Sequence, residues 1–401
     1  MTTATARVSV IHLILLASMS AIAPLTVDMY LPAFPAIADE MAVDSGRVPF
    51  TLSVFMVGFA AGQILYGPIS DQWGRLLPLT LGMLVFAGAS VGAAFANDID
   101  SLAAWRFAQG IGGAAGPVLA RAMVRDMFGR DEAARMLSLI TLIMGLAPML
   151  APFAGGLLLV EWGWRSIFYA LAVFALATWA GTKLAIPETL AQERRVPFGM
   201  AAMLRNFATM LARRRFLGYT LCAGFSSASL FAYIASSPLV FIEYFGLSPI
   251  AYTLAFGFNV TGFMLGAFAN GLLVRRWGSD RLLMVSTILA ASMGCAVAVV
   301  TFGLSGGLIA TMIPLYLFMP SISMTNTNAT AGALSEFPTM IGTASSLMGG
   351  LQFLIGAASG ALVGMLHDGT PTIMALLLGI AGVSGLLCRT LMIRPATNAA
   401  S

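Results

Sequence analysis

The sequence contains very little charge for its length. Of its 401 residues, 9% are Asp, Glu, Lys or Arg, and 59% are hydrophobic. A soluble domain carries about 25% charged residues, because its surface must be solvated. This shortage excludes an ordinary soluble protein and predicts an integral membrane protein. The formal net charge of +4 does not indicate a nucleic acid partner, since the arginines gather in alternate loops.

Histidine and cysteine are also scarce. The two histidines, His12 and His367, fall near the ends of predicted helices. The three cysteines, Cys222, Cys295 and Cys388, lie inside apolar segments without paired spacing. Zinc and haem sites need suitably spaced ligands, so we expect no metal site and no cofactor.

Long apolar runs are abundant. About twenty apolar residues of helix cross the hydrocarbon core of a membrane. Runs of that length predict an all-α membrane protein with twelve spanning helices. These helices begin near Val8, Pro49, Leu77, Ser101, Arg135, Arg165, Phe216, Pro249, Arg281, Gly307, Ile341 and Pro371.

The loop charges predict an orientation, because basic residues are enriched in cytoplasmic loops. With the amino terminus inside, the cytoplasmic loops or their edges hold Arg75, Arg125, Arg130, Arg194, Arg195, Arg213, Arg214, Arg215, Arg275 and Arg276. The opposite loops hold little that is basic besides Arg47 and Arg165. The bias predicts a multi-pass protein with both termini in the cytoplasm.

The chain also divides into two halves that repeat. The longest polar connection predicts a linker at 188–215 between six-helix bundles at 1–187 and 216–401. The run 67–74 aligns with 271–278 through a glycine, a tryptophan and a second glycine. Such a repeat implies two parallel six-helix halves with a ligand site between them.

The linker has two open interpretations. Apolar residues recur there at near-helical spacing, namely Phe198, Met203, Phe207, Met210 and Leu211. This spacing predicts a short amphipathic helix on the inner membrane surface. The alternative is a flexible tether.

One carboxylate lies inside the first apolar run. On a continuous helix that reaches water at Asp39, the carboxylate of Asp28 would lie roughly 16 Å below the membrane edge. A charge at that depth needs a partner, a water-filled cavity or a proton. The alternative is a helix that ends near Val27, with Asp28 on the periplasmic rim.

Several short motifs extend over nearly the whole chain. They are 28–35 (DMYLPAFP), 67–75 (GPISDQWGR), 106–110 (RFAQG), 124–126 (VRD), 336–338 (EFP) and 342–346 (GTASS). The run 67–75 resembles the loop between helices 2 and 3 of the major facilitator superfamily. The run 28–35 resembles the drug-proton antiporters of the Bcr/CflA type within that superfamily.

The resemblance implies a function. It implies proton-driven efflux of small, mostly apolar drugs of the bicyclomycin, sulfonamide or phenicol type across the bacterial inner membrane, by a monomer. The alternative is proton-coupled or passive transport of a small metabolite by the same fold. An intramembrane enzyme is disfavoured, because no cluster of catalytic residues extends over several helices.

The run 67–75 is similar to a gating loop that holds the cytoplasmic gate shut. The expected gating residues are Gly67, Asp71, Gly74, Arg75, Arg125 and Asp126. The glycines allow a tight reversal, and we expect Arg75 to pair with Asp126 at the end of the fourth helix. The alternative is that these charges only fix the topology.

The fifth predicted helix resembles the motif of the superfamily's antiporters. The matching residues are Gly145, Pro148, Pro152, Gly155 and Gly156. Proline kinks a helix and small residues allow close helix packing. We therefore expect a bent, closely packed helix.

A second intramembrane charge, Arg106, lies roughly 8 Å beneath the periplasmic edge. Its long side chain can reach toward Asp28, and proton uptake by Asp28 would weaken that attraction. Asp28 and Arg106 are therefore the expected proton-coupling residues. The alternative is an arginine that reaches the outer headgroups.

The substrate pocket is the least specified site. Candidate lining residues are Tyr30, Phe231, Tyr233, Asn259, Asn326, Asn328 and Gln352. They occur among many methionines and phenylalanines, whose surfaces suit ligands of varied shape.

Overall fold

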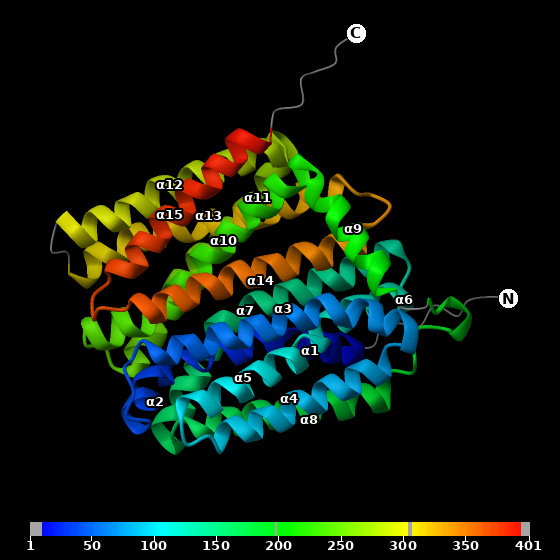
Figure 1. The fold of residues 1–401 in the computed structure, drawn as a ribbon, viewed down its shortest axis with the longest axis horizontal. Helices are drawn as coiled ribbons and strands as arrows, with labels where there is room; N and C mark the ends of the chain where they lie inside the picture. Colours follow the sequence, from blue (N-terminus) through cyan, green and yellow to red (C-terminus); the bar gives the residue numbers. More distant parts are fainter. Residues whose placement is uncertain (1–9, 197–198, 304–306, 394–401) are drawn as a thin grey trace, which may run out of the picture. The chain divides into compact units, whose positions relative to one another are not determined.

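The computed structural model describes residues 10–196, 199–303 and 307–393, except for the side chains of Arg130, Asp131 and Ala134. Its regular structure is helical throughout the described ranges (Figure 1). Internal contacts divide the chain into two compact units, Met1–Gly199 and Met200–Ser401. The predicted all-α membrane class is confirmed: eleven helical segments among the described residues are long and apolar enough to cross a membrane.

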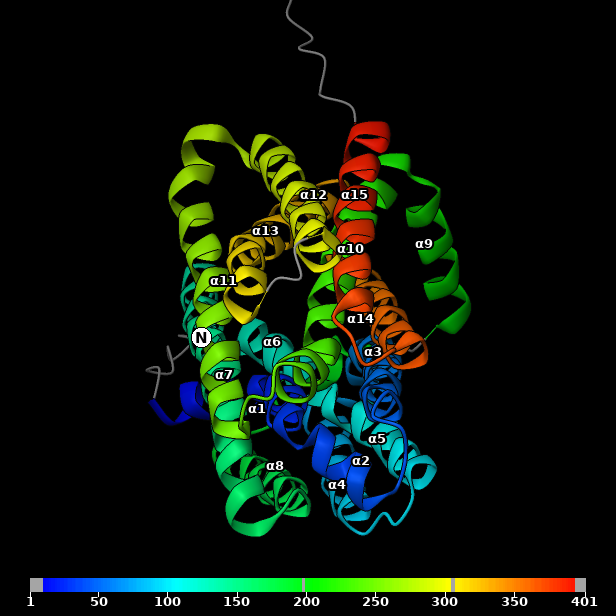
Figure 2. The same ribbon diagram turned by 90° about the vertical axis from the view of Figure 1, so that its left-hand side faces the viewer.

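Unit 1 contains the first half of the chain. Its elements are α1 (Val10–Asp28), η1 (Leu31–Ala33), α2 (Phe34–Glu40), α3 (Arg47–Trp73), α4 (Leu76–Ala94), α5 (Ile99–Gly113), α6 (Ala115–Met127), α7 (Arg130–Trp162), α8 (Arg165–Ala185) and η2 (Gln192–Arg194). Helix α5 packs against α3 and α4, α4 packs against α8, and α1 packs against α7 (Figure 2). At Gly110 of α5, a Cβ would overlap the backbone of Phe55, so glycine allows α3 and α5 to approach closely.

The first apolar run is not one continuous helix. The predicted start at Val8 lies outside the described residues, and α1 ends at Asp28. A 3₁₀ turn and the short helix α2 then follow, with Pro32 and Pro35 in their first turns. Proline disfavours helix at the preceding residue and donates no hydrogen bond, which explains the break. The expectation of a continuous helix from Asp28 to Asp39 was therefore wrong, and with it the depth based on helical rise, whereas the alternative of a helix that ends near Val27 agrees with the observed end of α1.

The fourth predicted span is divided. Helices α5 and α6 meet at Ala114, which follows two glycines, and Pro117 removes the backbone donor that would bond to the carbonyl of Gly113. Each half is too short to count alone among the eleven spans. The division explains why twelve runs in the sequence give eleven long apolar segments.

Unit 2 contains the second half of the chain. Its elements are α9 (Met200–Ala212), α10 (Arg214–Pro238), the π-helix η3 (Leu239–Tyr244), α11 (Pro249–Trp277), α12 (Ser279–Gly303), α13 (Leu308–Ser335), α14 (Ile341–Leu366) and α15 (Thr372–Met392). Helix α10 is central and contacts α13, α14 and α15, while α12 packs against α13 and α15 (Figure 2). Ala232, Ala235, Leu239 and Val363 form part of its apolar core.

The linker region contains the helix that its spacing predicted. Helix α9 packs against α10 and α14, with Phe207 and Met210 buried. Arg205 lies exposed on its outer side, and Phe198 lies outside the described residues. For residues 200–212, the flexible tether is therefore excluded.

Candidate functional site

Asp28 is the last residue of α1 and is only 3% exposed. Its neighbours in the chain, Val27 and Met29, are also buried, so the carboxylate is not on a solvated rim. Among the described residues, none forms a hydrogen bond or an ion pair with this carboxylate. A buried acid without a partner is suited to carry a proton, because neutralisation removes the cost of the buried charge.

Arg106 of α5 is fully buried beside the same segment of chain. Its Nη1 donates to the carbonyl of Thr26 at 3.5 Å, and its guanidinium lies 4.5 Å from the ring centroids of both Tyr30 and Phe55. Its Nε and Nη2 atoms have no hydrogen-bond acceptor among the described residues. The arginine therefore contacts residues on either side of Asp28, while two of its nitrogens, Nε and Nη2, remain without an acceptor among the described residues.

A chain of hydrogen bonds fixes the other side of Arg106. Its Nη1 donates to Oε1 of Gln109 at 2.7 Å, and Nε2 of Gln109 donates to the hydroxyl of Ser90 at 2.7 Å. Ser90 in turn donates to the carbonyl of Phe86. Because the hydroxyl proton of Ser90 is already used in the bond to Phe86, Ser90 can only accept a hydrogen bond from Gln109. The amide nitrogen of Gln109 therefore faces Ser90, and its amide oxygen faces Arg106.

The expected attraction between Asp28 and Arg106 is not an ion pair in this conformation. The reason is competition: aromatic rings and the amide of Gln109 hold the guanidinium. Arg106 also does not extend to solvent, so the alternative of a side chain that reaches the headgroups does not fit.

Helix α7 approaches the chain immediately after Asp28. A Cβ on Gly155 would overlap the carbonyl oxygen of Met29, so only glycine permits this contact. Pro148 and Pro152 lie inside α7 and Gly156 is buried, whereas an added Cβ on Gly145 would meet nothing. Gly155 of the predicted antiporter motif thus contacts the Asp28 segment.

The loop between α3 and α4 forms a second polar cluster. Arg75 donates to Asp126 at 2.8 Å, as the sequence predicted, and to Asp71 at 2.6 Å. Burial opposes charge on Arg75, but hydrogen bonds from its guanidinium to these carboxylates outweigh burial and raise the pKa of Arg75. The cluster therefore keeps a buried cation fully charged.

Glu188 was missed by the sequence analysis. Its carboxylate accepts hydrogen bonds from the backbone amides of Arg75 and Leu76 at 2.8 and 3.1 Å. Burial favours the neutral acid, but these bonds, with one from the amide of Leu190, outweigh burial and lower the pKa of Glu188. The sequence held one signal for this role, because Glu188 is a single acid shortly after an apolar helix. Helix α4 begins at the same end of the unit, where its first backbone amides have no partner within the helix.

Two gating residues behave differently from expectation. Gly67 lies within α3 and an added Cβ there would meet nothing, so it does not reverse the chain. Gly74 alone does so, with φ at 87°. Arg125 is exposed and donates to the carbonyl of Arg121 on its own helix, so it lies outside the cluster.

The predicted pocket residues lie in separate places within each unit. In unit 1, the hydroxyl of Tyr30 is bonded to Thr51 and its ring is buried. In unit 2, Asn259 donates to the hydroxyl of Tyr233 at 3.0 Å, and Phe231 contacts the ring of Phe353.

The remaining predicted pocket residues also differ in environment. Asn328 is bonded to Asn270, whereas Asn326 and Gln352 are half-buried. A small pocket inside unit 2 is lined by none of the predicted residues. Among the described residues, no group of three or more His, Cys, Asp or Glu side chains could hold a metal ion.

Comparison with known proteins identifies relatives along most of the chain. It is 33% identical over 377 residues to the bicyclomycin resistance protein homolog of Haemophilus influenzae, an alignment that covers 94% of each chain. It is 27% identical to multidrug resistance protein D of Escherichia coli, again covering 94% of each. The crystal structure of a D-xylose-proton symporter has the same fold, with a TM-score of 0.74, 15% identity, and coverage of 98% of this chain and 100% of that one.

The family model of the Major Facilitator Superfamily matches residues 16–361. This match spans both units and includes Asp28, Arg106 and the loop around Arg75. The chain belongs to the Major Facilitator Superfamily, a family of membrane transporters.

Proposed function

We propose that this protein exports small, mostly apolar drugs across the bacterial inner membrane in exchange for protons. Relatives named for bicyclomycin and multidrug resistance support drug efflux, and they align with nearly the whole chain. The scarcity of buried charge in unit 2 fits a weakly charged substrate. A transporter rather than an enzyme accounts for these features.

The proposal includes an orientation and an oligomeric state. The protein lies in the inner membrane as a monomer with both termini in the cytoplasm. The arginine bias of the loops supports this orientation. In it, the cluster around Arg75 lies at the cytoplasmic end of unit 1 and stabilises one conformation of the transport cycle.

The observation that carries the coupling mechanism is that two buried groups of opposite charge form no ion pair and keep hydrogen-bonding atoms unused. Among the described residues, Asp28 has no hydrogen-bond or ion-pair partner, and Nε and Nη2 of Arg106 have no acceptor. When Asp28 takes a proton from the periplasm, it becomes neutral and has no attraction to Arg106. When it releases that proton, the carboxylate gains the two unused nitrogens of Arg106, Nε and Nη2, as a compensating partner.

Drug binding completes the exchange. If the drug binds more tightly to the conformation with charged Asp28, its binding releases the proton, and proton binding releases the drug in the same proportion. The aromatic rings around Arg106 exclude water, so that the charge state of Asp28 depends on nearby protein groups and on the bound drug.

The test is transport by purified protein in proteoliposomes with an imposed pH gradient. Wild-type protein should move a phenicol or bicyclomycin-type drug against its gradient, toward the acidic side. Asp28→Asn should abolish this uphill transport while it retains drug binding. Asp100→Asn is a matched control, because that side chain is 83% exposed and pairs with Arg47 at the surface.

Uphill transport by Asp28→Asn would show that the coupling carboxylate is elsewhere. Net drug movement toward the alkaline side would instead favour uptake.

A further inference from the structure

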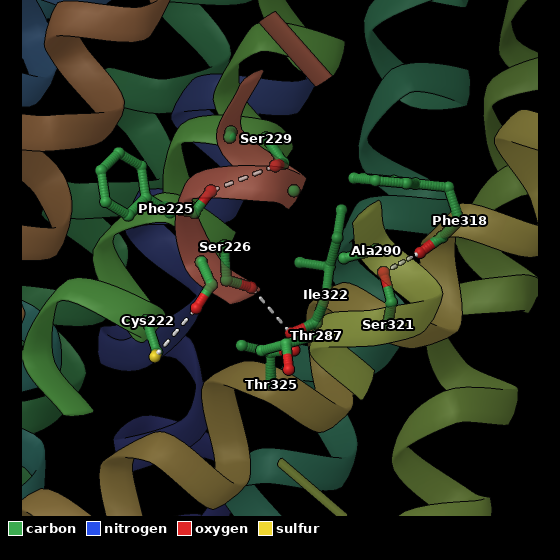
Figure 3. Close-up of a pocket in the computed structure, with 13 residues that line it drawn as sticks. Cys222, Phe225, Ser226, Ser229, Thr287, Ala290, Phe318, Ser321, Ile322 and Thr325 are labelled. Carbon is green, nitrogen blue, oxygen red and sulfur yellow. Dashed lines mark hydrogen bonds between the residues drawn. The ribbon is translucent and has the colours of Figure 1, made fainter. Parts of the chain in front are cut away.

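The interior of unit 2 contains a small pocket where α10, α12, α13 and α15 meet (Figure 3). Its free space is on the order of one water molecule. Five hydroxyl side chains line it, from Ser226, Ser229, Thr287, Ser321 and Thr325. All five are less than 10% exposed.

We propose that this pocket is a binding site for an ordered water molecule that joins the helices of unit 2. Three features of the pocket support this site: the register of the internal repeat, the hydrogen bonds that the lining residues already form, and the absence of charged side chains among them.

Comparison of the two halves of the repeat shows that the sequence of unit 2 has small and hydroxyl residues at positions that line the pocket. The offset that aligns Trp73 with Trp277 also aligns α1 with α10 and α4 with α12, because the starts of each pair match to within one residue. At this offset, four large apolar residues of unit 1 correspond to small or hydroxyl residues of unit 2. The pairs are Ile22 with Ser226, Leu25 with Ser229, Met83 with Thr287, and Phe86 with Ala290.

In unit 1 these large side chains fill the interior. A Cβ on Gly113 would lie 3.1 Å from the ring of Phe86 and 3.6 Å from Ile22, which shows that both side chains reach the same point. Phe86, Met83 and Ile22 are fully buried. The corresponding volume in unit 2 is bordered by hydroxyl groups instead. A chance packing defect would not replace three apolar residues by hydroxyl residues around one pocket.

The hydrogen bonds define what the pocket can bind. Ser226 donates to the carbonyl of Ile322 at 3.0 Å, and Thr325 donates to Ser286 at 2.8 Å. Ser229, Thr287 and Ser321 each donate to a carbonyl of their own helix. The dashed lines in Figure 3 mark several of these bonds. Because every hydroxyl proton is already used, the pocket offers lone pairs, and its ligand must be a hydrogen-bond donor.

Charge excludes the other small donors. The lining residues carry no carboxylate, so a desolvated metal cation or ammonium ion would lack a counter-charge. An anion would meet only acceptors. Water satisfies the lone pairs with both of its protons and fits the available space.

The first test is a crystal structure of the full-length protein at a resolution that shows ordered water, with and without xenon pressure. We expect one water peak within hydrogen-bond distance of at least two of the five hydroxyl oxygens, and no xenon. Xenon in the pocket would overturn the proposal, because apolar cavities bind xenon and hydrated ones do not. A pocket without water density would also overturn it.

The second test uses matched variants in detergent solution. Thr287→Val removes a pocket oxygen and a hydroxyl proton that is shared between the carbonyls of Leu283 and Met284 in its own helix. Thr253→Val removes the same kind of bond from a buried threonine of α11 outside the pocket. We expect Thr287→Val to lower the thermal midpoint by about 2 °C more than Thr253→Val does. Equal shifts would contradict a bound water, whether or not either variant transports drug.

Discussion

The interiors of the two units contain polar groups of different kinds. Among the described residues, the charged side chains less than 5% exposed are Asp28 and Arg106, both in unit 1. The interior of unit 2 contains neutral groups, such as Asn259, Asn328 and the pocket hydroxyls. Its buried arginine, Arg389, donates to the carbonyls of Asp280 and Ile393 near the end of α15.

This difference predicts that the two halves of the chain have different roles in transport. A buried charge can respond to a proton, whereas a neutral hydroxyl or amide cannot do so between pH 5 and 8. The comparison therefore predicts that variants in unit 1 change the coupling to protons, and that equivalent variants in unit 2 change stability alone.

The largest difference should appear between the two buried arginines. Arg106→Gln removes the partner available to charged Asp28, and we expect gradient-driven efflux to fall about tenfold or more. Arg389→Gln removes contacts to backbone carbonyls, and we expect less folded protein but an unchanged ratio of uphill to downhill transport. Both rates are measured per folded molecule in proteoliposomes. A loss of coupling in Arg389→Gln would contradict the proposal that proton coupling depends on the buried charges of unit 1 alone.

The ion pairs provide the next comparison. The side chains of Arg75 and Asp126 are each 8% exposed, whereas those of Arg215 and Glu336 in unit 2 are 43% and 20% exposed. Asp126→Asn leaves a buried cation with less compensation and should cost about 3–5 kcal/mol. Glu336→Gln should cost about 0–1 kcal/mol.

Thermal unfolding in detergent measures these costs. Drug turnover should also slow in Asp126→Asn with little change in drug affinity, because we propose that the cluster stabilises one conformation of the transport cycle without binding the drug. Normal turnover in this variant would reduce the cluster to a determinant of topology.

A smaller difference is expected between two glycines with equivalent backbone. Gly74 and Gly278 have φ angles of 87° and 77° and follow the helices α3 and α11. Alanine at either position costs about 1–3 kcal/mol from backbone strain. At Gly74 the added Cβ would also meet Glu188, whereas at Gly278 it would meet nothing. Gly74→Ala should therefore lower the thermal midpoint more than Gly278→Ala, and the reverse order would contradict the cluster's geometry.

The smallest expected effect concerns acid. The pKa of Glu188 is lowered from its ordinary value of 4.5, so its contribution to stability is present above pH 4.5 and is lost as the pH falls through the lower folded-state value. Thermal midpoints measured below pH 4.5 should fall less steeply in Glu188→Gln than in wild type. Glu193→Gln, at an exposed position on η2, should retain the wild-type slope.

Much of the fold was predictable, because membrane-spanning helices are specified by apolar length alone. Predicted starts such as Pro49, Leu77 and Ile341 lie within two residues of helix starts in the structure. The break after Asp28 matches only the alternative of a helix that ends near Val27, which was not the favoured prediction although Pro32 and Pro35 were visible, because apolar composition says nothing about helix continuity. The ion pair of Arg75 with Asp126 followed from opposite charges at helix ends.

The environment of Arg106 could not be predicted from the sequence. Its contacts come from three helices, and the orientation of Gln109 depends on Ser90, which is distant in sequence. Similarly, the pocket of unit 2 depends on four helices and appears in the sequence only when the two halves are aligned. Hydrophobic periodicity identifies helices, but it does not show which side chains from distant segments pack against one another.

The most direct test of the central claim is proton release upon drug binding. Purified protein in weakly buffered detergent solution is mixed with a neutral drug, and the pH change is recorded across a range of starting pH values. Wild type should release protons when the drug binds, and its affinity should depend on pH. Asp28→Asn should bind the drug without proton release and with an affinity that no longer depends on pH. Undiminished proton release by Asp28→Asn would contradict the assignment of Asp28 as the proton carrier.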